Sequence, residues 1–358
     1  MRMSKHHKQV ALSVSLVAVS VLLTLLVFEL GLRFLGFRSA VLESKMFAVM
    51  DDDLLPYILR PGYEGYFAGG KVTVDAYGNR VVPIPSKTLQ HGYEEIVLLG
   101  DSVVFGQGLD DGYTIGAHMQ KKLASKNIRV AMISAPGYTS WNEYAALLRY
   151  RNLAKVTTVV LVYVGNDITM DNDFFKLRQT GGRIIFMDQN IWHKLLHAAY
   201  DNSRTVFAVA DGVKRLLYGR QHASPTYEVD EPALAYSMDA IRKMHEACAI
   251  RGIELIVAIH RDGFFYRSRK AAEEYERKVS VALKAVGVDH FILQSATNKL
   301  DYHEFVVAWN DGHPSAEASE IIGGEIVAQL SQRRVQEKYI SRDNGISDTG
   351  GKRRPGLH

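Results

Sequence analysis

The feature that most constrains the fold of this chain is an alternation of short apolar runs with helical patterns between residues 93 and 332. Short continuous apolar runs are typical of strands buried on both faces, and buried strands separated by helices are typical of a parallel sheet. The pattern therefore predicts an α/β fold, a doubly wound parallel sheet of about five strands flanked by helices on both faces.

The predicted elements follow one another regularly along the chain. The strands are expected at Glu95–Leu99, Arg129–Ile133, Thr158–Val164, Glu254–Ile259 and near His290–Leu293. The helices are expected at residues 113–125, 141–153, 233–251, 268–286 and 315–332. Ligands of such sheets bind beyond the carboxyl ends of the strands, so polar residues just after these strands are the first candidates for a functional site.

A second segment, near the N-terminus, is suited to a membrane. Residues from Gln9 to Phe28 carry no charge, and a helix of about 20 residues spans the roughly 30 Å hydrocarbon core of a bilayer. A cleaved signal peptide also begins with basic residues and an apolar run, but its apolar part is usually shorter and closes at a small-x-small site, which is missing here. We therefore predict a transmembrane signal anchor over residues 9–30.

The charges beside this segment predict its orientation. Residues 1–8 carry three lysines and arginines, whereas Arg33 and Arg38 follow the segment and Glu29 offsets one of them. By the positive-inside rule, residues 1–8 form a cytoplasmic tip. The rest of the chain is then periplasmic or extracellular, and the protein is a single-pass protein of the cell inner membrane.

Three further regions surround or interrupt the alternating pattern. Residues 31–92 are predicted to be a juxtamembrane lead-in with a short strand at Lys71–Val74, and not a separate domain. Residues 174–232 are predicted to be an insertion carrying one amphipathic helix near 191–218, suited either to core packing or to a lid over a site. Residues 333–358 lack apolar periodicity and are predicted to be a basic, flexible tail.

Charge and cysteine content exclude several classes of protein. The 43 basic and 39 acidic residues leave the chain slightly positive, but much of the positive charge lies at its two ends, so the body is mildly acidic. A nucleic-acid-binding domain needs clustered lysine and arginine on its folded body, so no nucleic-acid partner is expected. The single cysteine, Cys248, excludes an internal disulfide framework and cysteine-based metal clusters.

The chemical signal is strongest after the first predicted strand, where Gly100, Asp101 and Ser102 follow one another. A serine at a glycine turn between a strand and a helix presents its hydroxyl at the carboxyl edge of the sheet. The ordinary alternative is that Asp-Ser caps the next helix, since both residues are common at that position.

Three other segments are expected at the same edge. Gly137 follows the second strand and can offer a backbone N–H, and Asn166 follows the third strand and can offer a side-chain amide. His313 stands on a predicted loop before the closing helix, with Asn310 and Asp311 just before it. The sequence therefore predicts that a nucleophile, two hydrogen-bond donors and a histidine with an acid come together.

With these residues in view, the sequence resembles the SGNH hydrolases, also called GDSL esterases, and in particular their membrane-anchored bacterial branch. Gly100-Asp101-Ser102 is similar to the first family block, Gly137 to the second, Asn166 to the third and His313 to the fifth. Two positions depart from the family. Val164 stands where the third block usually has glycine, and Asn310 stands where the fifth block usually has aspartate, so His313 is supported either by Asp311, which we favour, or by Asn310.

The resemblance implies roles for these residues. Ser102 would be the nucleophile, His313 the general base and Asp311 the residue that orients the histidine. The N–H groups of Ser102 and Gly137, with the Asn166 amide, would form the oxyanion hole. The chemistry implies no metal and no organic cofactor.

Three functions fit these features. The first is a membrane-anchored serine esterase that removes acyl groups, O-acetyl groups among them, from envelope glycans or lipids. The second is an O-acyltransferase, in which a sugar hydroxyl replaces water with the same residues. The third is a non-catalytic scaffold or glycan-binding protein of this fold, which the two departures would allow. The acyl chain length, the oligomeric state and the natural substrate are not encoded in any pattern we identify.

Overall fold

The structure is a computed structural model that describes residues 5–35, 46–85, 89–168, 203–206, 208–209, 229–266, 268–308 and 311–346. Within these residues the central sheet has five parallel strands in the order β6-β5-β7-β8-β9. The strands are β5 (Glu94–Gly100), β6 (Ile128–Ser134), β7 (Val156–Tyr163), β8 (Glu254–His260) and β9 (Asp289–Leu293). The predicted fold class and all five predicted strands are confirmed.

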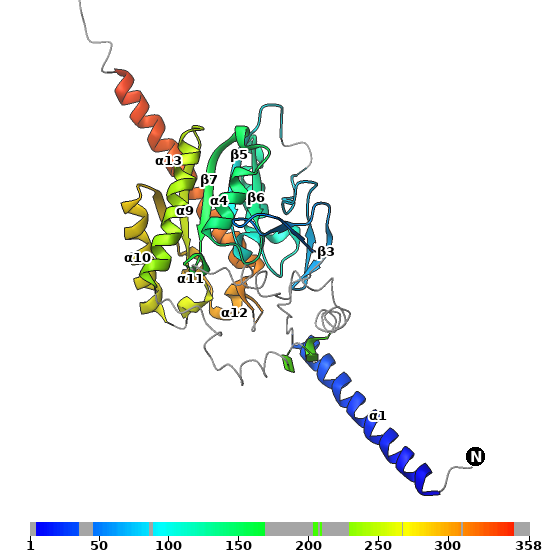
Figure 1. Ribbon diagram of the computed structural model, residues 1–358. Coiled ribbons are helices and arrows are strands. Elements are labelled where there is room, and N and C mark those ends of the chain that lie inside the picture. Colours follow the sequence, from blue (N-terminus) through cyan, green and yellow to red (C-terminus); the bar gives the residue numbers. More distant parts are fainter. Residues whose placement is uncertain are drawn as a thin grey trace, which may run out of the picture.

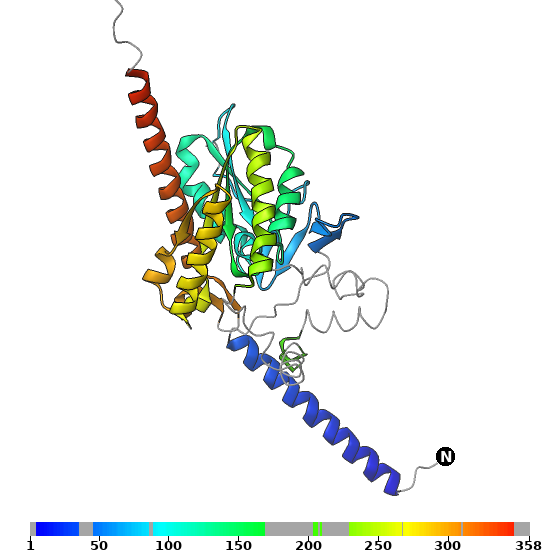
Figure 2. The same cartoon turned by 60° about the vertical axis from the view of Figure 1, so that its left-hand side comes forward.

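Helices cover both faces of this sheet, as Figures 1 and 2 show. One face is covered by α3 (Ile115–Leu123) and α13 (Ala316–Ile346). The other is covered by α4 (Ser140–Leu148), α9 (Glu231–Ala249) and α10 (Arg269–Ala285). Strand β5 illustrates the reason, because Ile96 and Leu98 pack on the first face while Val97 and Leu99 pack on the second. A strand that is apolar on both sides needs helices on both sides.

The closing part of the fold differs from the prediction in two ways. After the short helices α11 (Ser295–Lys299) and α12 (Tyr302–Phe305), the chain forms a hairpin of β10 (Val306–Ala308) and β11 (Asp311–Pro314). His313 therefore lies on a short strand, and the prediction of a loop was wrong. Helix α13 also continues to Ile346, beyond the predicted end at residue 332, so part of the predicted flexible tail is helical.

The lead-in packs onto the body of the fold. It forms two small antiparallel sheets, one of β1 (Phe47–Val49) and β2 (Tyr57–Leu59) and one of β3 (Glu64–Phe67) and β4 (Gly70–Thr73). Their apolar side chains share a core with Phe105, Ala135 and Tyr138, which follow strands β5 and β6. The lead-in is thus attached to the edge of the sheet where the candidate site was expected.

The N-terminal segment is the helix α1 (Lys5–Phe34). Among the described residues, its stretch Leu12–Phe34 is the one that is long and apolar enough to cross a membrane, by length and composition. The predicted amphipathic helix near 191–218 falls mostly outside the described residues. Asn310 also lies outside them.

Candidate active site

A tight turn places Ser102 at the carboxyl end of β5. Asp101 caps the short helix α2 (Ser102–Phe105), and its Oδ1 accepts a hydrogen bond of 2.9 Å from the N–H of Val103. A Cβ atom on Gly100 would lie 2.4 Å from Cγ2 of Val104, so only glycine lets α2 approach the strand this closely. The capping interpretation of Asp-Ser is therefore correct for Asp101, whereas the Ser102 hydroxyl takes no part in the cap.

A chain of hydrogen bonds joins Ser102, His313 and Asp311. Nε2 of His313 lies 2.8 Å from Oγ of Ser102, and Nδ1 of His313 lies 2.5 Å from Oδ1 of Asp311. Because a carboxylate accepts hydrogen bonds, Nδ1 carries the proton and the lone pair of Nε2 faces the serine hydroxyl. The geometry is that of a serine activated by a histidine, with the histidine held by an acid.

The hairpin positions the acid and the histidine together. Oδ1 of Asp311 also accepts from the backbone N–H of His313, at 3.2 Å, and Oδ2 accepts from Nε2 of Gln107, at 3.4 Å. The side chain of Asp311 is 4% exposed, whereas that of His313 is 24% exposed. The acid is therefore buried behind the histidine, and the histidine faces the opening.

The two groups shift each other's pKa. Burial alone would raise the pKa of Asp311, but the charge and hydrogen bonds of His313 outweigh burial and lower it. Burial alone would lower the pKa of His313, but Asp311, with smaller contributions from Asp101 and Asp262, raises it above its usual value. Asp311 is therefore ionised, and His313 is a stronger base than an isolated histidine.

Gly137 and Asn166 lie at the same edge of the sheet as Ser102. Gly100 pairs with Ser134, so the loop after β6 that carries Gly137 lies next to the serine turn. Gly137 has a φ of +82°, a conformation that glycine adopts without strain. Asn166 lies on the short 3₁₀ turn Gly165–Asp167, which follows β7 on the other side of β5.

Asp101 connects Asn166 to Ser102. Its Oδ2 accepts a hydrogen bond of 2.9 Å from Nδ2 of Asn166 and lies 3.1 Å from Oγ of Ser102, where it is the alternative acceptor for the hydroxyl proton that otherwise points to His313. An ionised carboxylate only accepts, so it requires the NH₂ group of Asn166 on its side. One amide hydrogen is used in this contact, and the second remains for a substrate oxygen.

Two further acids, which we call the inner acids, lie behind Asp101. Glu143 and Asp167 are 0% and 1% exposed, and neither Glu143 oxygen has a hydrogen-bond partner within the part of the chain that the structure describes. Burial raises the pKa of both well above the usual value; the charges of Asp167 and Asp101 add to the rise at Glu143, and the charge of Asp101 adds to it at Asp167, where hydrogen bonds from Val164 and Ser140 oppose it. The inner acids are therefore held in their neutral form.

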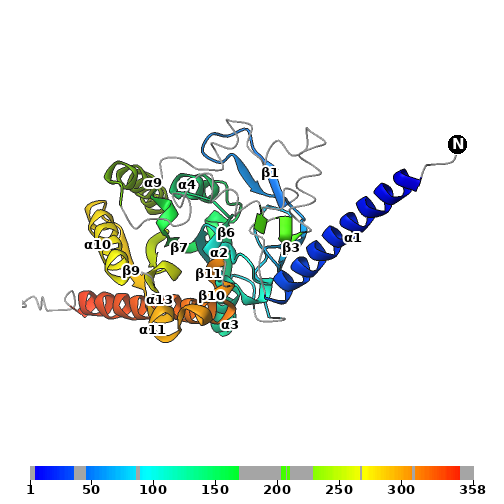
Figure 3. The ribbon, with the colours of Figure 1, turned by 90° about the horizontal axis from the view of Figure 1, so that it is seen from below.

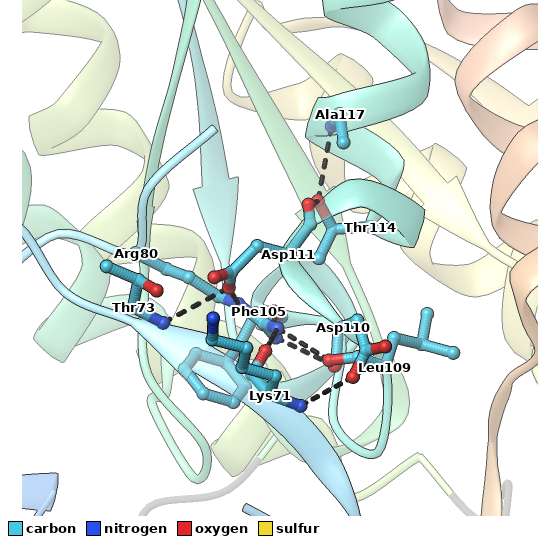
Figure 4. A network of polar contacts seen from close by, with 10 residues as sticks. Lys71, Thr73, Arg80, Phe105, Leu109, Asp110, Asp111, Thr114 and Ala117 are labelled. Atoms are coloured by element: carbon cyan, nitrogen blue, oxygen red, sulfur yellow. Dashed lines mark hydrogen bonds and ion pairs between the residues drawn. The ribbon is translucent and has the colours of Figure 1, made fainter. Parts of the chain in front are cut away.

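Arg80, from the lead-in, stabilises the turn that follows Ser102 (Figure 4). Its side chain is completely buried and donates to Asp111 and to four backbone carbonyls, those of Lys71, Phe105, Gly106 and Leu109. Burial lowers the pKa of Arg80, and Asp111 partly compensates, but a guanidinium remains charged in proteins. The planar fork of arginine suits this convergence of carbonyls, which a lysine would not match.

The lead-in also holds the loop that carries Gly137. The hydroxyl of Tyr57 donates to the carbonyl of Pro136 at 2.9 Å, and the hydroxyl of Tyr138 donates to the carbonyl of Tyr57 at 3.1 Å. Tyr138 is therefore a packing residue. The lead-in thus stabilises two of the loops that surround Ser102.

The sequence patterns missed several residues of this site. Gln107 and Glu143 lie outside the motif segments, and Arg80 ends a lead-in segment to which the sequence assigned no role at the site. The roles of all three depend on contacts between distant elements. The position of Arg80 directly after the Gly78-Asn79 turn was a weak signal of its role, since an arginine that becomes buried there needs hydrogen-bond acceptors. His260, the last residue of β8, is buried against Phe305, and desolvation with the nearby His313 lowers its pKa to about 3.

Comparison with known proteins gives distant similarities. No protein family model matches this chain, and no curated protein matches it. Among solved structures, it is similar to TesA, with 15% identity over 66% of this chain and 98% of that chain and a TM-score of 0.42. It is also similar to a lipase/acylhydrolase from Enterococcus faecalis, with 14% identity over 67% of this chain and 96% of that chain and a TM-score of 0.40.

A third similar structure is a member of the lipolytic protein G-D-S-L family from Veillonella parvula, with 11% identity over 66% of this chain and 97% of that chain and a TM-score of 0.39. G-D-S-L is also the family that the sequence resembles.

Proposed function

We propose that this chain is a membrane-anchored serine esterase of the SGNH type, acting on acyl esters outside the cytoplasm. The observation that carries this proposal is the hydrogen-bonded chain from Ser102 through His313 to Asp311. The three residues come from the end of β5 and from a distant hairpin, and they are arranged for nucleophilic attack.

In the first step, Oγ of Ser102 attacks the ester carbonyl carbon while Nε2 of His313 takes its proton. The carbonyl oxygen becomes an oxyanion, which the N–H groups of Ser102 and Gly137 and the free amide hydrogen of Asn166 stabilise. The ester bond then breaks, and the histidinium returns the proton to the leaving alcohol. An acyl group remains bound to Ser102.

In the second step, a water molecule takes the place of the alcohol. His313 removes its proton as it attacks the acyl carbon, and then protonates Ser102 as the acid product leaves. Asp311 stabilises the histidinium in both steps and keeps the imidazole in the tautomer that presents Nε2 to the serine.

The raised pKa of His313 supports this assignment over a non-catalytic scaffold, because a structural serine needs no basic partner. The apolar stretch Leu12–Phe34 supports attachment to a membrane, with residues 1–8 in the cytoplasm and the esterase domain on the other side. Acyl esters of envelope glycans or lipids, O-acetyl esters among them, are the substrates within reach from that position.

The full chain in detergent can be tested on p-nitrophenyl esters with acyl chains of increasing length, beside Ser102→Ala and His313→Ala. We expect hydrolysis by the wild type and its loss in both variants. A fluorophosphonate probe should label Ser102 covalently, since only an activated serine reacts. Hydrolysis that survives Ser102→Ala, or a wild type that neither hydrolyses an ester nor takes the probe, would contradict the proposal.

A further inference from the structure

The outer end of α1 is bonded to a segment that follows the Asn166 turn in sequence. The carboxylate of Glu29 accepts hydrogen bonds from the N–H groups of Arg204 and Thr205, at 3.1 and 2.8 Å. It also accepts from the hydroxyls of Ser203 and Thr205, at 3.0 and 2.9 Å. A carboxylate at the first N–H groups of a helical turn is a favourable arrangement, so residues 203–206 are held on α1.

These contacts place residues 203–206 at the membrane surface. Glu29 also pairs with Arg33 at 2.8 Å, and the Arg33 side chain is 49% exposed. Charged groups are costly in the hydrocarbon core and are tolerated near the ends of a membrane span. Residues 203–206 therefore lie at the level of the lipid head groups, on the side of the membrane that holds the esterase domain.

The connection between the anchor and the site is short. Residues 36–45 join Leu35 to Met46 and span at most about 40 Å when fully extended. Met46 is fully buried in the core of the lead-in, which also holds the turn after Ser102 through Arg80. The site is therefore tethered within about 40 Å of chain from the end of the anchor.

The site also lies at the end of the molecule from which the anchor extends. Figures 1 and 2 show α1 leaving the molecule at the end where α11 and α12 lie. Figure 3 views this end, with α2, β10 and β11, the elements that carry Ser102 and His313, in the middle of the body and α1 extending away to the right. The elements at the carboxyl edge of the sheet therefore lie at the end of the molecule from which α1 extends in these views.

From these observations we propose that the ester cleaved at Ser102 is carried on the head group of a lipid or lipid-linked molecule in the same membrane. The inference rests on the proposed esterase function. A site tethered to the bilayer meets head groups at a high effective concentration, whereas an ester dissolved in water is met only at its bulk concentration. The ester belongs to the head group because the site stands on the water-soluble domain, above the hydrocarbon core.

The test uses the full chain reconstituted in phosphatidylcholine vesicles and one ester in two forms. A butyryl ester on a polar head group is supplied either in solution or attached to a diacyl lipid in the vesicle. A variant with a helical spacer of four EAAAK repeats between Arg38 and Ser39 raises the domain by about 30 Å. Glu29→Gln, whose amide cannot accept as a carboxylate does, weakens the contact with residues 203–205.

We expect the wild type to turn over the lipid-borne ester at least tenfold faster than the soluble ester at equal bulk concentration. The spacer should reduce the rate on the lipid-borne ester at least tenfold, and Glu29→Gln should reduce it about threefold. Both variants should keep the wild-type rate on the soluble ester, which shows that they are folded.

Two results would overturn the inference. One is a lipid-borne ester that is cleaved no faster than the soluble one, and the other is a spacer variant that cleaves both as the wild type does. Failure of the proposed function is recognisable separately, because neither form would then be cleaved and Ser102→Ala would behave as the wild type.

Discussion

The carboxylates on the two sides of Ser102 behave in opposite ways. On the hairpin side, Asp311 is buried beside His313, and this partner lowers its pKa despite the burial. On the β7 side, the inner acids Glu143 and Asp167 are buried without a cation, and their pKa is raised. All three acids are buried, so burial alone does not explain the opposite directions of their pKa shifts. The difference is the basic partner, which Asp311 has and the inner acids lack among the described residues.

Asp101 lies between these two regions and interacts with both. It accepts from Asn166 and lies 3.1 Å from Oγ of Ser102, its charge raises the pKa of His313, and it raises the pKa of the inner acids. The following predictions test this division, from the largest expected effect to the smallest.

The largest effect is expected at the centre, where Ser102→Ala removes the nucleophile. We expect kcat to fall by about 10⁴-fold or more, because the histidine and the oxyanion donors alone give little turnover. Steady-state hydrolysis of a p-nitrophenyl ester measures this change. An unchanged melting temperature would confirm that the loss is chemical, whereas a loss below tenfold would remove Ser102 from the mechanism.

Asp311→Asn should have the next largest effect, because it removes the negative charge that lies beside His313. We expect kcat to fall by about 10³–10⁴-fold, since an amide can hold the imidazole in the wrong tautomer. Asn310→Ala is the matched control and should retain at least half of the wild-type rate. If the two variants exchange these results, the supporting residue is Asn310 and the comparison between the two regions fails.

Asp101→Asn tests the residue shared by both regions. We expect kcat to fall about 10- to 100-fold, because Asn166 is no longer held with its NH₂ group toward the substrate. The pKa of His313 is raised partly by Asp101, and His313 must be neutral to act as a base. The acid limb of kcat/KM should therefore move to lower pH in this variant, a shift that general damage to the fold would not produce.

Arg80→Lys tests how much the guanidinium of Arg80, which pairs with Asp111 and donates to backbone carbonyls, contributes to stability and activity. We expect a loss of about 3–5 kcal/mol in the free energy of unfolding, because acceptors arranged for a guanidinium are left without donors. The residual activity of folded protein should also fall severalfold, since the turn after Ser102 loses its support. Denaturant unfolding and activity assays measure the two effects.

Arg129→Lys is a control for this prediction. Arg129 pairs with the buried Glu95 at 3.0 Å, at the opposite end of the sheet from Ser102. Its replacement should reduce stability while leaving the activity of the folded protein unchanged. Equal losses of activity in both variants would show that Arg80 has no special relation to the serine turn.

The smallest effect on activity is expected for Glu143→Gln. A neutral glutamine resembles a protonated glutamate, so kcat near neutral pH should change less than threefold. Because folding raises the pKa of Glu143, this residue stabilises the fold most at acidic pH, and its contribution is lost as the pH rises from the unfolded-state pKa toward the folded-state pKa.

The melting temperature of the wild type should therefore fall between pH 5 and pH 8 by more than that of Glu143→Gln. For a domain of this size, each kcal/mol of change in the free energy of unfolding shifts the melting temperature by about 2–4 °C. Calorimetry at the two pH values measures the difference. Identical changes in the two proteins would show that Glu143 does not bear the proton that the comparison assigns to it.

Much of the fold could be predicted because its signals are local. A strand such as β7 is apolar along its whole length, and that pattern alone indicates burial on both faces. Gly100 and the residues after it could be assigned to a turn for the same reason. The residues after each strand could therefore be placed at one edge of the sheet before any coordinates were known.

The contacts within the site could not be predicted in the same way. Ser102 and His313 are separated by 211 positions, and their 2.8 Å contact depends on the order of the strands and on the hairpin β10–β11. Arg80 was visible as a residue of the lead-in, but its acceptors were not, because they are backbone carbonyls of another segment.

The sequence by itself determined the α/β class, the apolar N-terminal helix and the residue types that gather at one edge of the sheet, because each follows from a periodicity or a turn within a short window. Only the tertiary structure decided that Asp311 reaches His313, that Arg80 supports the turn after Ser102, and that the inner acids are neutral. Distance and burial set hydrogen bonds and pKa values, and both arise only when distant segments pack together.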